Sequence, residues 1–94
     1  MPADRKFEWD PAKAAANDRK HRLRFEEARS VFDDLTSITR FDPLHSESEE
    51  RFVTIGFSQR GRLLVVVHAD EGQLIRIISA RRATRREAGN YGQA

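Results

Sequence analysis

The spacing of hydrophobic residues in the first third of the chain is helical. Asp10 is a favourable N-cap residue, and Pro11 at the first helical position precedes an alanine-rich segment, which predicts a helix from Pro11 to about His21. A second short helix is predicted from Phe25 to about Phe32, because its apolar residues recur three and four positions apart. The apolar stripe of the second helix would pack against the core.

The period changes to two further along the chain. The residues that favour strands fall into five segments, 7–9, 36–41, 51–58, 62–70 and 73–81. The last three are separated by turns at Gly61 and Gly72, which predicts an antiparallel meander, and the acidic segment 43–50 reads as a loop. The unbroken apolar run Leu63–Val67 indicates a central strand that is covered on both faces, with helices on at least one side.

The C-terminal segment carries the signature of a capped helix. Thr84 and Glu87 form a capping-box pattern, and the helix should end near Gly92. The predicted order is therefore β-α-α-β-β-β-β-α, an α+β fold in one domain over residues 1–94, with a mostly antiparallel sheet and helices packed against it.

Composition narrows the functional classes. The chain has no cysteine, and its three histidines lack the spacing of a metal site, so we predict neither a metal nor another cofactor. The N-terminus is charged, and no apolar run approaches the roughly 18 residues of a membrane span. These features predict a cytoplasmic protein without a membrane interaction.

The charge is unevenly divided along the chain. Residues 1–50 hold 9 Lys/Arg and 12 Asp/Glu, a net charge of −3, whereas residues 51–94 hold 8 and 3, a net charge of +5. Fourteen of the 17 basic residues are arginine, which binds phosphate with two parallel hydrogen bonds and stacks on bases. The basic half therefore suggests a polyanionic ligand, although a biased genomic base composition also raises arginine content.

Most of this positive charge lies in "RIISARRATRRE", residues 76–87. Arg76 stands among isoleucines and needs an anion, either a phosphate or a structural carboxylate. Arg81 ends the strand, and arginines follow it near a helix N-terminus, where the helix dipole disfavours cations. These arginines, Arg82, Arg85 and Arg86, are either ordinary helix surface or contacts to a nucleic-acid backbone.

Two further side chains could take part in chemistry or simply pack. His68 ends the apolar run and is either a proton carrier or a core histidine. With a two-residue loop at Glu71-Gly72, His68 would face Ile75 and share a sheet face with Ser79 and Arg81, and a three-residue loop would reverse this. Tyr91 could stack on a base or seal the last helix onto the core.

The first predicted helix carries a polar stripe. Lys13, Asn17, Lys20 and His21 stand at offsets 0, 4, 7 and 8, on one side of the helix. The stripe is either a solvated face, with Asn17 or His21 bound to neighbouring backbone, or a positive wall beside a groove.

Three stretches of the sequence resemble the BrnT-type toxins of bacterial type II toxin–antitoxin systems. They are "FEWDPAKAAANDRKHRLRFEEARSVFDD" (7–34), "ERFVTIGFSQRGRLLVVVH" (50–68) and "IRIISARRATRREAGNY" (75–91), in the family's order. The family's "SAR" motif matches residues 79–81, and His68, Arg76 and Tyr91 also match. The chain departs from the family after His21, where "RLR" replaces the usual glycine and serine-bearing cap, so this turn forms without the residue that best adopts a left-handed conformation.

The resemblance implies a RelE-like fold, RNA cleavage that arrests translation, and neutralisation by a BrnA-type antitoxin. We therefore predict a metal-independent endoribonuclease in which the RNA 2′-hydroxyl is the nucleophile. The predicted catalytic residues are His68, Arg76, Arg81 and Tyr91. His68 could instead be structural, and Glu87 is the alternative base. The predicted RNA-binding residues are Lys13, Lys20, Arg82, Arg85 and Arg86. The predicted partners are RNA and the antitoxin, with a toxin homodimer inside a toxin–antitoxin heterotetramer. The alternative is a non-catalytic module that binds nucleic acid or a protein partner.

Overall fold

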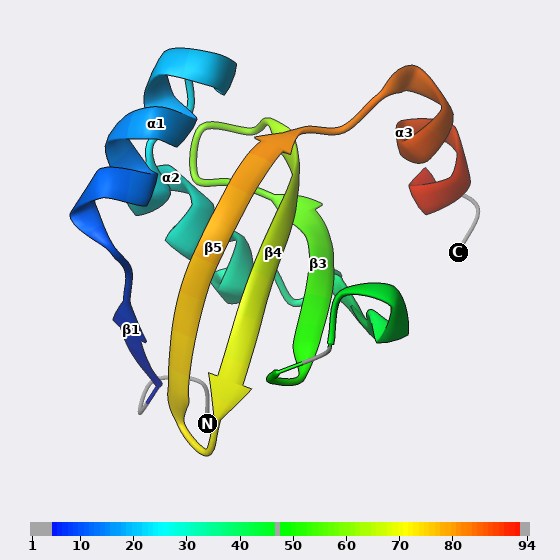
Figure 1. Ribbon diagram of the computed structural model, residues 1–94. Helices are drawn as coiled ribbons and strands as arrows, with labels where there is room; N and C mark the ends of the chain where they lie inside the picture. Colours follow the sequence, from blue (N-terminus) through cyan, green and yellow to red (C-terminus); the bar gives the residue numbers. More distant parts are fainter. Residues whose placement is uncertain (1–4, 47, 93–94) are drawn as a thin grey trace.

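The computed structural model describes residues 5–46 and 48–92 and shows one five-stranded sheet with helices (Figure 1). The elements are β1 (Lys6–Glu8), α1 (Pro11–His21), α2 (Phe25–Ser30), η2 (Val31–Asp33), β2 (Ile38–Phe41), η3 (Pro43–His45), β3 (Arg51–Phe57), β4 (Leu63–Glu71), β5 (Leu74–Arg82) and α3 (Arg85–Gly92). The predicted α+β class and element order are confirmed. The second predicted helix differs in detail, because its last turn, η2, is a 3₁₀ helix.

The strands are ordered β1-β5-β4-β3-β2, and all neighbouring pairs except β1–β5 are antiparallel. Strand β4, which contains the apolar run Leu63–Val67, lies at the centre of the sheet as predicted. Strand β1 pairs with only the first part of β5, from Leu74 to Arg76. The rest of that edge of β5 is therefore not covered by a strand.

Helices α1 and α2 both contact β5; in Figure 1, α1 lies beside β5 at the upper left and α2 passes behind the strands. The core between them contains apolar side chains from both layers: Leu23, Phe25, Ala28, Val31 and Phe32 from the helical segment, and Leu64, Val66, Ile75, Ile77 and Ala80 from the strands. The opposite face of the sheet carries α3, which has no buried residue. We call this second face the open face.

Local sequence explains the start and the end of α1. The Asp10 carboxylate accepts a hydrogen bond from Ala12 N at 2.8 Å, and Pro11 has no N–H that would need a partner. At the other end Arg22 adopts the left-handed conformation (φ 55°, ψ 42°) and donates its N–H to Asp18 O. The chain thus makes with an arginine the turn that glycine makes most easily.

The turn between β3 and β4 is fixed to α2 by a buried carboxylate. Glu27 is 6% exposed and accepts hydrogen bonds from the guanidinium of Arg62 and from Ser58 Oγ. The Arg62 hydrogen bonds outweigh burial and hold the pKa of Glu27 below its ordinary value. Glu27 is therefore ionised and joins the helical layer to the end of the sheet.

Candidate nucleic-acid interface and active site

His68 lies on the face that the helices cover and is only 1% exposed. Its ring packs against Phe32 and Phe52, with centroids 4.9 and 6.0 Å away. Nδ1 is 2.6 Å from Asp70 Oδ1 and Nε2 is 2.7 Å from Thr54 Oγ1. A carboxylate can only accept, so Nδ1 carries the proton and Nε2 accepts from the threonine hydroxyl. Burial lowers the pKa of His68, which keeps the ring neutral at neutral pH.

The predicted face-sharing of His68 with Ser79 and Arg81 was wrong. The hairpin loop is Gly72-Gln73 rather than Glu71-Gly72, so His68 pairs with Ile77. Strand β5 then carries an extra residue, Ile78, at a β-bulge, after which Ser79 pairs with Val67 and Arg81 with Val65. Because successive strand residues point to opposite faces, Ser79 and Arg81 lie on the open face and His68 on the covered one.

Arg81 and Glu87 form a two-pronged ion pair at the open face. Arg81 Nη1 and Nη2 are each 2.8 Å from a Glu87 carboxylate oxygen, and Thr84 N donates to the same carboxylate at 2.8 Å. Glu87 N in turn donates to Thr84 Oγ1, which completes the predicted capping box. The Arg81 hydrogen bonds lower the pKa of Glu87 to about 2. In this state Glu87 is a weak base and occupies the side of Arg81 that would otherwise bind a phosphate.

Tyr91 attaches α3 to the start of β2. Its hydroxyl donates to Thr36 O at 2.9 Å and lies 2.8 Å from Thr36 Oγ1. Its ring makes an edge contact with Phe57, at 5.7 Å between centroids. Of the two roles predicted for Tyr91, the contacts are those of a residue that seals the helix onto the sheet.

Arg76 has a structural carboxylate as its partner. Its guanidinium binds both oxygens of Glu49, which raises the pKa of Arg76. Glu49 also lies 3.6 Å from Arg51 Nε. The acidic loop therefore supplies the anion that Arg76 requires, through Glu49, which lies 27 residues away in sequence.

The polar stripe of α1 lines a groove along the part of β5 that β1 leaves uncovered. We call this the α1 groove; its volume is about 230 Å³, and it is lined by Lys13, Ala16, Asn17, Lys20, His21, Ile78 and Ser79. Asn17 is buried, donating to Leu23 O and accepting from Ala80 N, both at 3.0 Å. Lys13 and Lys20 are exposed and form a positive wall of this groove. The hydrogen bonds of Asn17 to backbone correspond to the other alternative that we predicted for the stripe.

A central hollow of about 440 Å³ lies on the open face, on the other side of Ser79. Its polar lining comes from Arg40, Asp42, Ser79, Arg81 and Glu87, and its apolar lining from Phe41, Val53, Val65 and Val67. Because Ser79 lines both the α1 groove and the central hollow, the two form one basic path around β5. Of the predicted RNA-binding residues, Lys13 and Lys20 belong to this path.

The remaining predicted arginines, Arg82, Arg85 and Arg86, are exposed. Within residues 5–46 and 48–92 none of them forms an ion pair, so all three are available to an external anion. Arg82 ends β5 and Arg85 and Arg86 begin α3, so they lie where the last strand leads into the last helix. The sequence prediction that positive charge collects at the rim of the sheet agrees with this placement.

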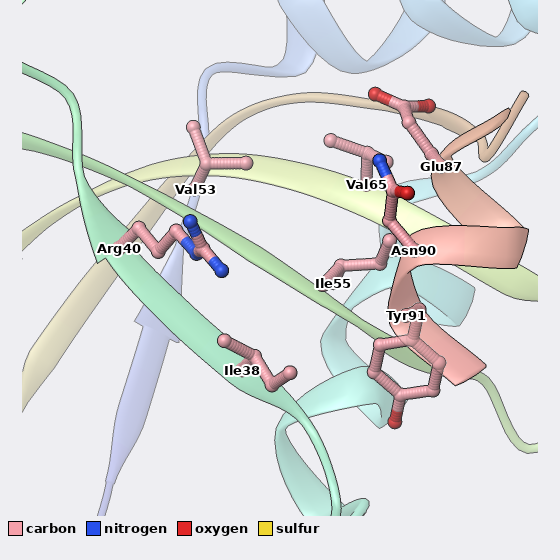
Figure 2. A pocket seen from close by; sticks show the side chains of 8 residues that line it. All are labelled: Ile38, Arg40, Val53, Ile55, Val65, Glu87, Asn90 and Tyr91. Atoms are coloured by element: carbon pink, nitrogen blue, oxygen red, sulfur yellow. The ribbon is translucent and has the colours of Figure 1, made fainter. Parts of the chain in front are cut away.

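Two residues of the site were not recognised from the sequence. Arg40 of β2 lines the central hollow and a second hollow beneath α3, and Asn90 lines the second one (Figure 2). The alternation of Ile38 and Arg40 with Thr39 and Phe41 placed Arg40 on a definite face of the outer strand. What the sequence did not show is that this face is the one that also carries Arg81.

Two classes of site are not found in the part of the chain that the structure describes. No group of three or more His, Asp or Glu side chains is placed to hold a metal ion. No helix among the described residues is long and apolar enough to cross a membrane.

The fold and the site define a small α+β domain with a basic path around one strand of its sheet. A model of the family described as "Ribonuclease toxin, BrnT, of type II toxin-antitoxin system" matches residues 9–87, and the chain belongs to this family. The crystal structure of the Brucella abortus ribonuclease toxin BrnT has a similar fold, with a TM-score of 0.62 and 23% identity over 86% of this chain and 99% of that chain. Among curated proteins no relative matches the chain.

Proposed function

We propose that this chain is a metal-independent endoribonuclease that acts in the cytoplasm, cleaves RNA through attack by its own 2′-hydroxyl and arrests translation. The family supplies the class of activity, a ribonuclease toxin. The observation that carries the proposal is the continuous path from Lys13 and Lys20, over Ser79, to Arg81, Glu87 and Arg40. Such a path can hold a phosphate backbone and bring one phosphate to a cation beside a carboxylate.

The reaction requires a proton acceptor and a cation at the phosphate that becomes pentacoordinate. Arg81 and Arg40 would stabilise the charge on that phosphate. Glu87 would accept the proton of the 2′-hydroxyl, the 2′-oxygen would bond to phosphorus, and the bond to the 5′-oxygen would break, with solvent supplying the proton to the leaving oxygen. The products are a 2′,3′-cyclic phosphate and a 5′-hydroxyl.

Substrate binding would also prepare Glu87 for this role. A phosphate that binds Arg81 would replace the Glu87 carboxylate, and loss of the two hydrogen bonds from Arg81 would raise the pKa of Glu87 from about 2 toward its ordinary value. The ion pair is thus the resting state of a base that is released when RNA binds. Of the predicted catalytic residues, this scheme keeps Arg81 in the chemistry, because Arg81 lines the central hollow. Arg76, Tyr91 and His68 do not line it and bind protein groups, so the scheme gives them structural roles.

The second candidate is a non-catalytic module that binds nucleic acid. The burial of His68 favours it, because His68, the histidine of the described strands, is separated from Arg81 and the central hollow by the sheet. Both candidates share the same path and differ only in whether Glu87 and Arg81 act on a bound phosphate.

The proposed partner that silences the toxin is a BrnA-type antitoxin, within a heterotetramer that contains two toxins. An acidic or amphipathic segment of it would cover the region from Arg76 to Arg86, where exposed arginines favour electrostatic steering. RNA and antitoxin would then compete for one surface.

The test is cleavage of a defined RNA by purified protein in EDTA, with a matched substrate that carries 2′-deoxyribose at the cut position. We expect cleavage of the first to a cyclic phosphate and none of the second. Arg81→Lys keeps the charge but loses the two-pronged geometry, so its single-turnover rate should fall about a hundredfold or more while RNA affinity changes little. Cleavage of the 2′-deoxy substrate, or activity that EDTA abolishes and Mg²⁺ restores, would contradict the mechanism; binding without cleavage would support the second candidate.

A further inference from the structure

A second hollow on the open face lies beneath α3 and has a volume of about 300 Å³. We call it the α3 hollow. Its floor consists of four aliphatic side chains, Ile38, Val53, Ile55 and Val65. Its rim consists of four polar side chains, Arg40, Glu87, Asn90 and Tyr91. Figure 2 shows Ile38 and Arg40 on one side and the α3 residues on the other, with the Arg40 side chain extending toward α3. Its size is at the lower end of the range in which proteins bind small molecules, roughly 300 to 1,000 Å³.

The rim contains an amide that can read a ligand. Asn90 is exposed, and its side chain makes no hydrogen bond to any part of the chain that the structure describes. An asparagine amide offers a donor and an acceptor side by side, which is the pattern that pairs with the edge of a nucleobase. The aliphatic floor suits the flat, apolar face of such a base.

The α3 hollow is continuous with the place proposed for the phosphate. Arg40, Val53, Val65 and Glu87 line both the α3 hollow and the central hollow. Arg40 forms no ion pair within residues 5–46 and 48–92, so its guanidinium can bind an added anion. An occupant that presents a flat apolar ring on one side and a negative charge on the other, at the boundary of two joined hollows, has the chemistry of a nucleotide.

We propose that the α3 hollow is the base-binding subsite of the ribonuclease: one RNA base lies on the aliphatic floor, Asn90 reads its edge, and Arg40 binds the adjoining phosphate. The proposal rests on the proposed RNA cleavage and adds to it a source of sequence preference. Asn90 is then a specificity-determining residue, and Tyr91 holds α3 in the position from which Asn90 reaches the base.

The first experiment compares cleavage sites in a random-sequence RNA pool. Asn90→Asp keeps the size of the side chain but replaces a donor with an acceptor. Gly89→Asp is the control, because it places the same charge one residue away. A new side chain at Gly89 meets no atom within 4 Å, and Gly89 lines neither the α3 hollow nor the central hollow. We expect Asn90→Asp to change the base preferred at one position beside the cut by about tenfold or more, and Gly89→Asp to leave it unchanged.

A second measurement separates this inference from the proposed activity. The four nucleoside 3′-monophosphates are titrated against the folded protein, with binding followed by NMR. We expect one base to bind more tightly, Asn90→Asp to change that order, and Arg40→Ala to weaken all four alike.

Each combined outcome has a definite meaning. Cleavage with an Asn90→Asp site profile identical to that of the unaltered protein would overturn the base subsite while leaving the ribonuclease intact. Absence of cleavage together with Asn90-dependent nucleotide binding would support the subsite and overturn the ribonuclease. Equal binding of all four nucleotides by both proteins would overturn the subsite whether or not RNA is cut.

Discussion

At the scale of single residues, Arg22 is in a conformation that L-residues rarely adopt. Among the described residues it is the only non-glycine with a positive φ, 55°. The left-handed region costs an L-residue roughly 1–2 kcal/mol. Part of this cost is offset because an arginine loses less backbone entropy on folding than a glycine does.

Arg22→Gly should therefore stabilise the protein. We expect the free energy of unfolding to rise by about 0.5–1 kcal/mol, and the melting temperature of a chain of this size by a few degrees. Thermal unfolding followed by circular dichroism measures this. Arg19→Gly, inside the same helix, is the control and should lose about 1 kcal/mol. An unchanged or lower melting temperature for Arg22→Gly would mean that the arginine side chain makes a compensating contribution.

His68 should make stability depend on pH near neutrality. Its pKa is lowered in the folded protein because the ring is buried, so the unfolded chain binds the additional proton first as pH falls. The stability linked to His68 is thus complete above its ordinary pKa of 6.5 and is lost progressively as pH falls below that value. The carboxylates with lowered pKa, Glu27 and Glu87, act in the same direction at more acidic pH.

His68→Gln isolates this effect, because glutamine can hydrogen-bond but does not titrate. In urea unfolding at pH 8, 7, 6 and 5, we expect the unaltered protein to lose more stability from pH 7 to pH 5 than the variant. The variant itself should be less stable at pH 8, since the contacts to Thr54 and Asp70 are fitted to imidazole. Parallel stability profiles of the two proteins would show that His68 is not the titrating group.

At the scale of elements, α3 is held to the open face by few contacts. It has no buried residue, and it is anchored at its start by Glu87 with Arg81 and at its end by Tyr91 with Thr36. Helices with so little buried apolar surface draw their stability from such anchors, and open locally when one is removed.

Tyr91→Phe tests the second anchor, because it removes the hydroxyl and keeps the ring on Phe57. The amides of α3 should exchange with deuterium several-fold faster, while those of β4 stay nearly unchanged. We expect global stability to fall by about 1 kcal/mol, the net value of a typical hydrogen bond. Hydrogen exchange read by mass spectrometry measures both segments in one experiment. Equal acceleration in α3 and β4 would mean that α3 unfolds only with the rest of the domain.

The elements themselves could be predicted from the sequence, but the faces of the last strand could not. The Asp10-Pro11 cap, the apolar run of β4 and the Thr84–Glu87 capping box are local signals, and each marks an element that the structure contains. The bulge at Ile78 is different, because a single extra residue reverses every side chain after it and no local pattern marks it. For a two-residue loop at Glu71-Gly72, sequence reasoning therefore placed His68 on the face of Arg81, although the sheet separates them.

The partner of a charged side chain also could not be predicted from the sequence when it comes from a distant part of the chain. Arg76 is neutralised by Glu49 of the acidic loop, and Arg40 is brought to the central hollow by an outer strand. Both depend on long-range placement: β2 joins the sheet beside β3, and the loop between these two strands brings Glu49 to Arg76. Spacing along one element was enough to offer the α1 groove as one of two alternatives, because its four polar residues lie on a single helix.

At the scale of the whole molecule, the basic path passes around one strand and joins two layers of the fold. Lys13 and Lys20 stand on the helical side, Arg40 and Arg81 on the open face, and Ser79 lies between them. A single-stranded RNA that follows this path would release counterions at both ends, so affinity should depend steeply on salt. An RNA that contacts the open face alone would not respond to changes on α1.

Lys13→Ala with Lys20→Ala tests whether the path is used along its full length. For single strands each lost phosphate contact lowers the slope of log affinity against log salt by about 0.7, so the double variant should have a slope shallower by about 1.4. The matched control is Lys6→Ala with Arg19→Ala, which removes the same charge from exposed positions outside the α1 groove. Binding is measured between 50 and 200 mM salt (about a fourfold range) by fluorescence anisotropy, with an RNA made uncleavable by 2′-deoxy substitution. Equal slopes for the two double variants would show that the lysines contribute only through net charge, and would confine the RNA to the open face.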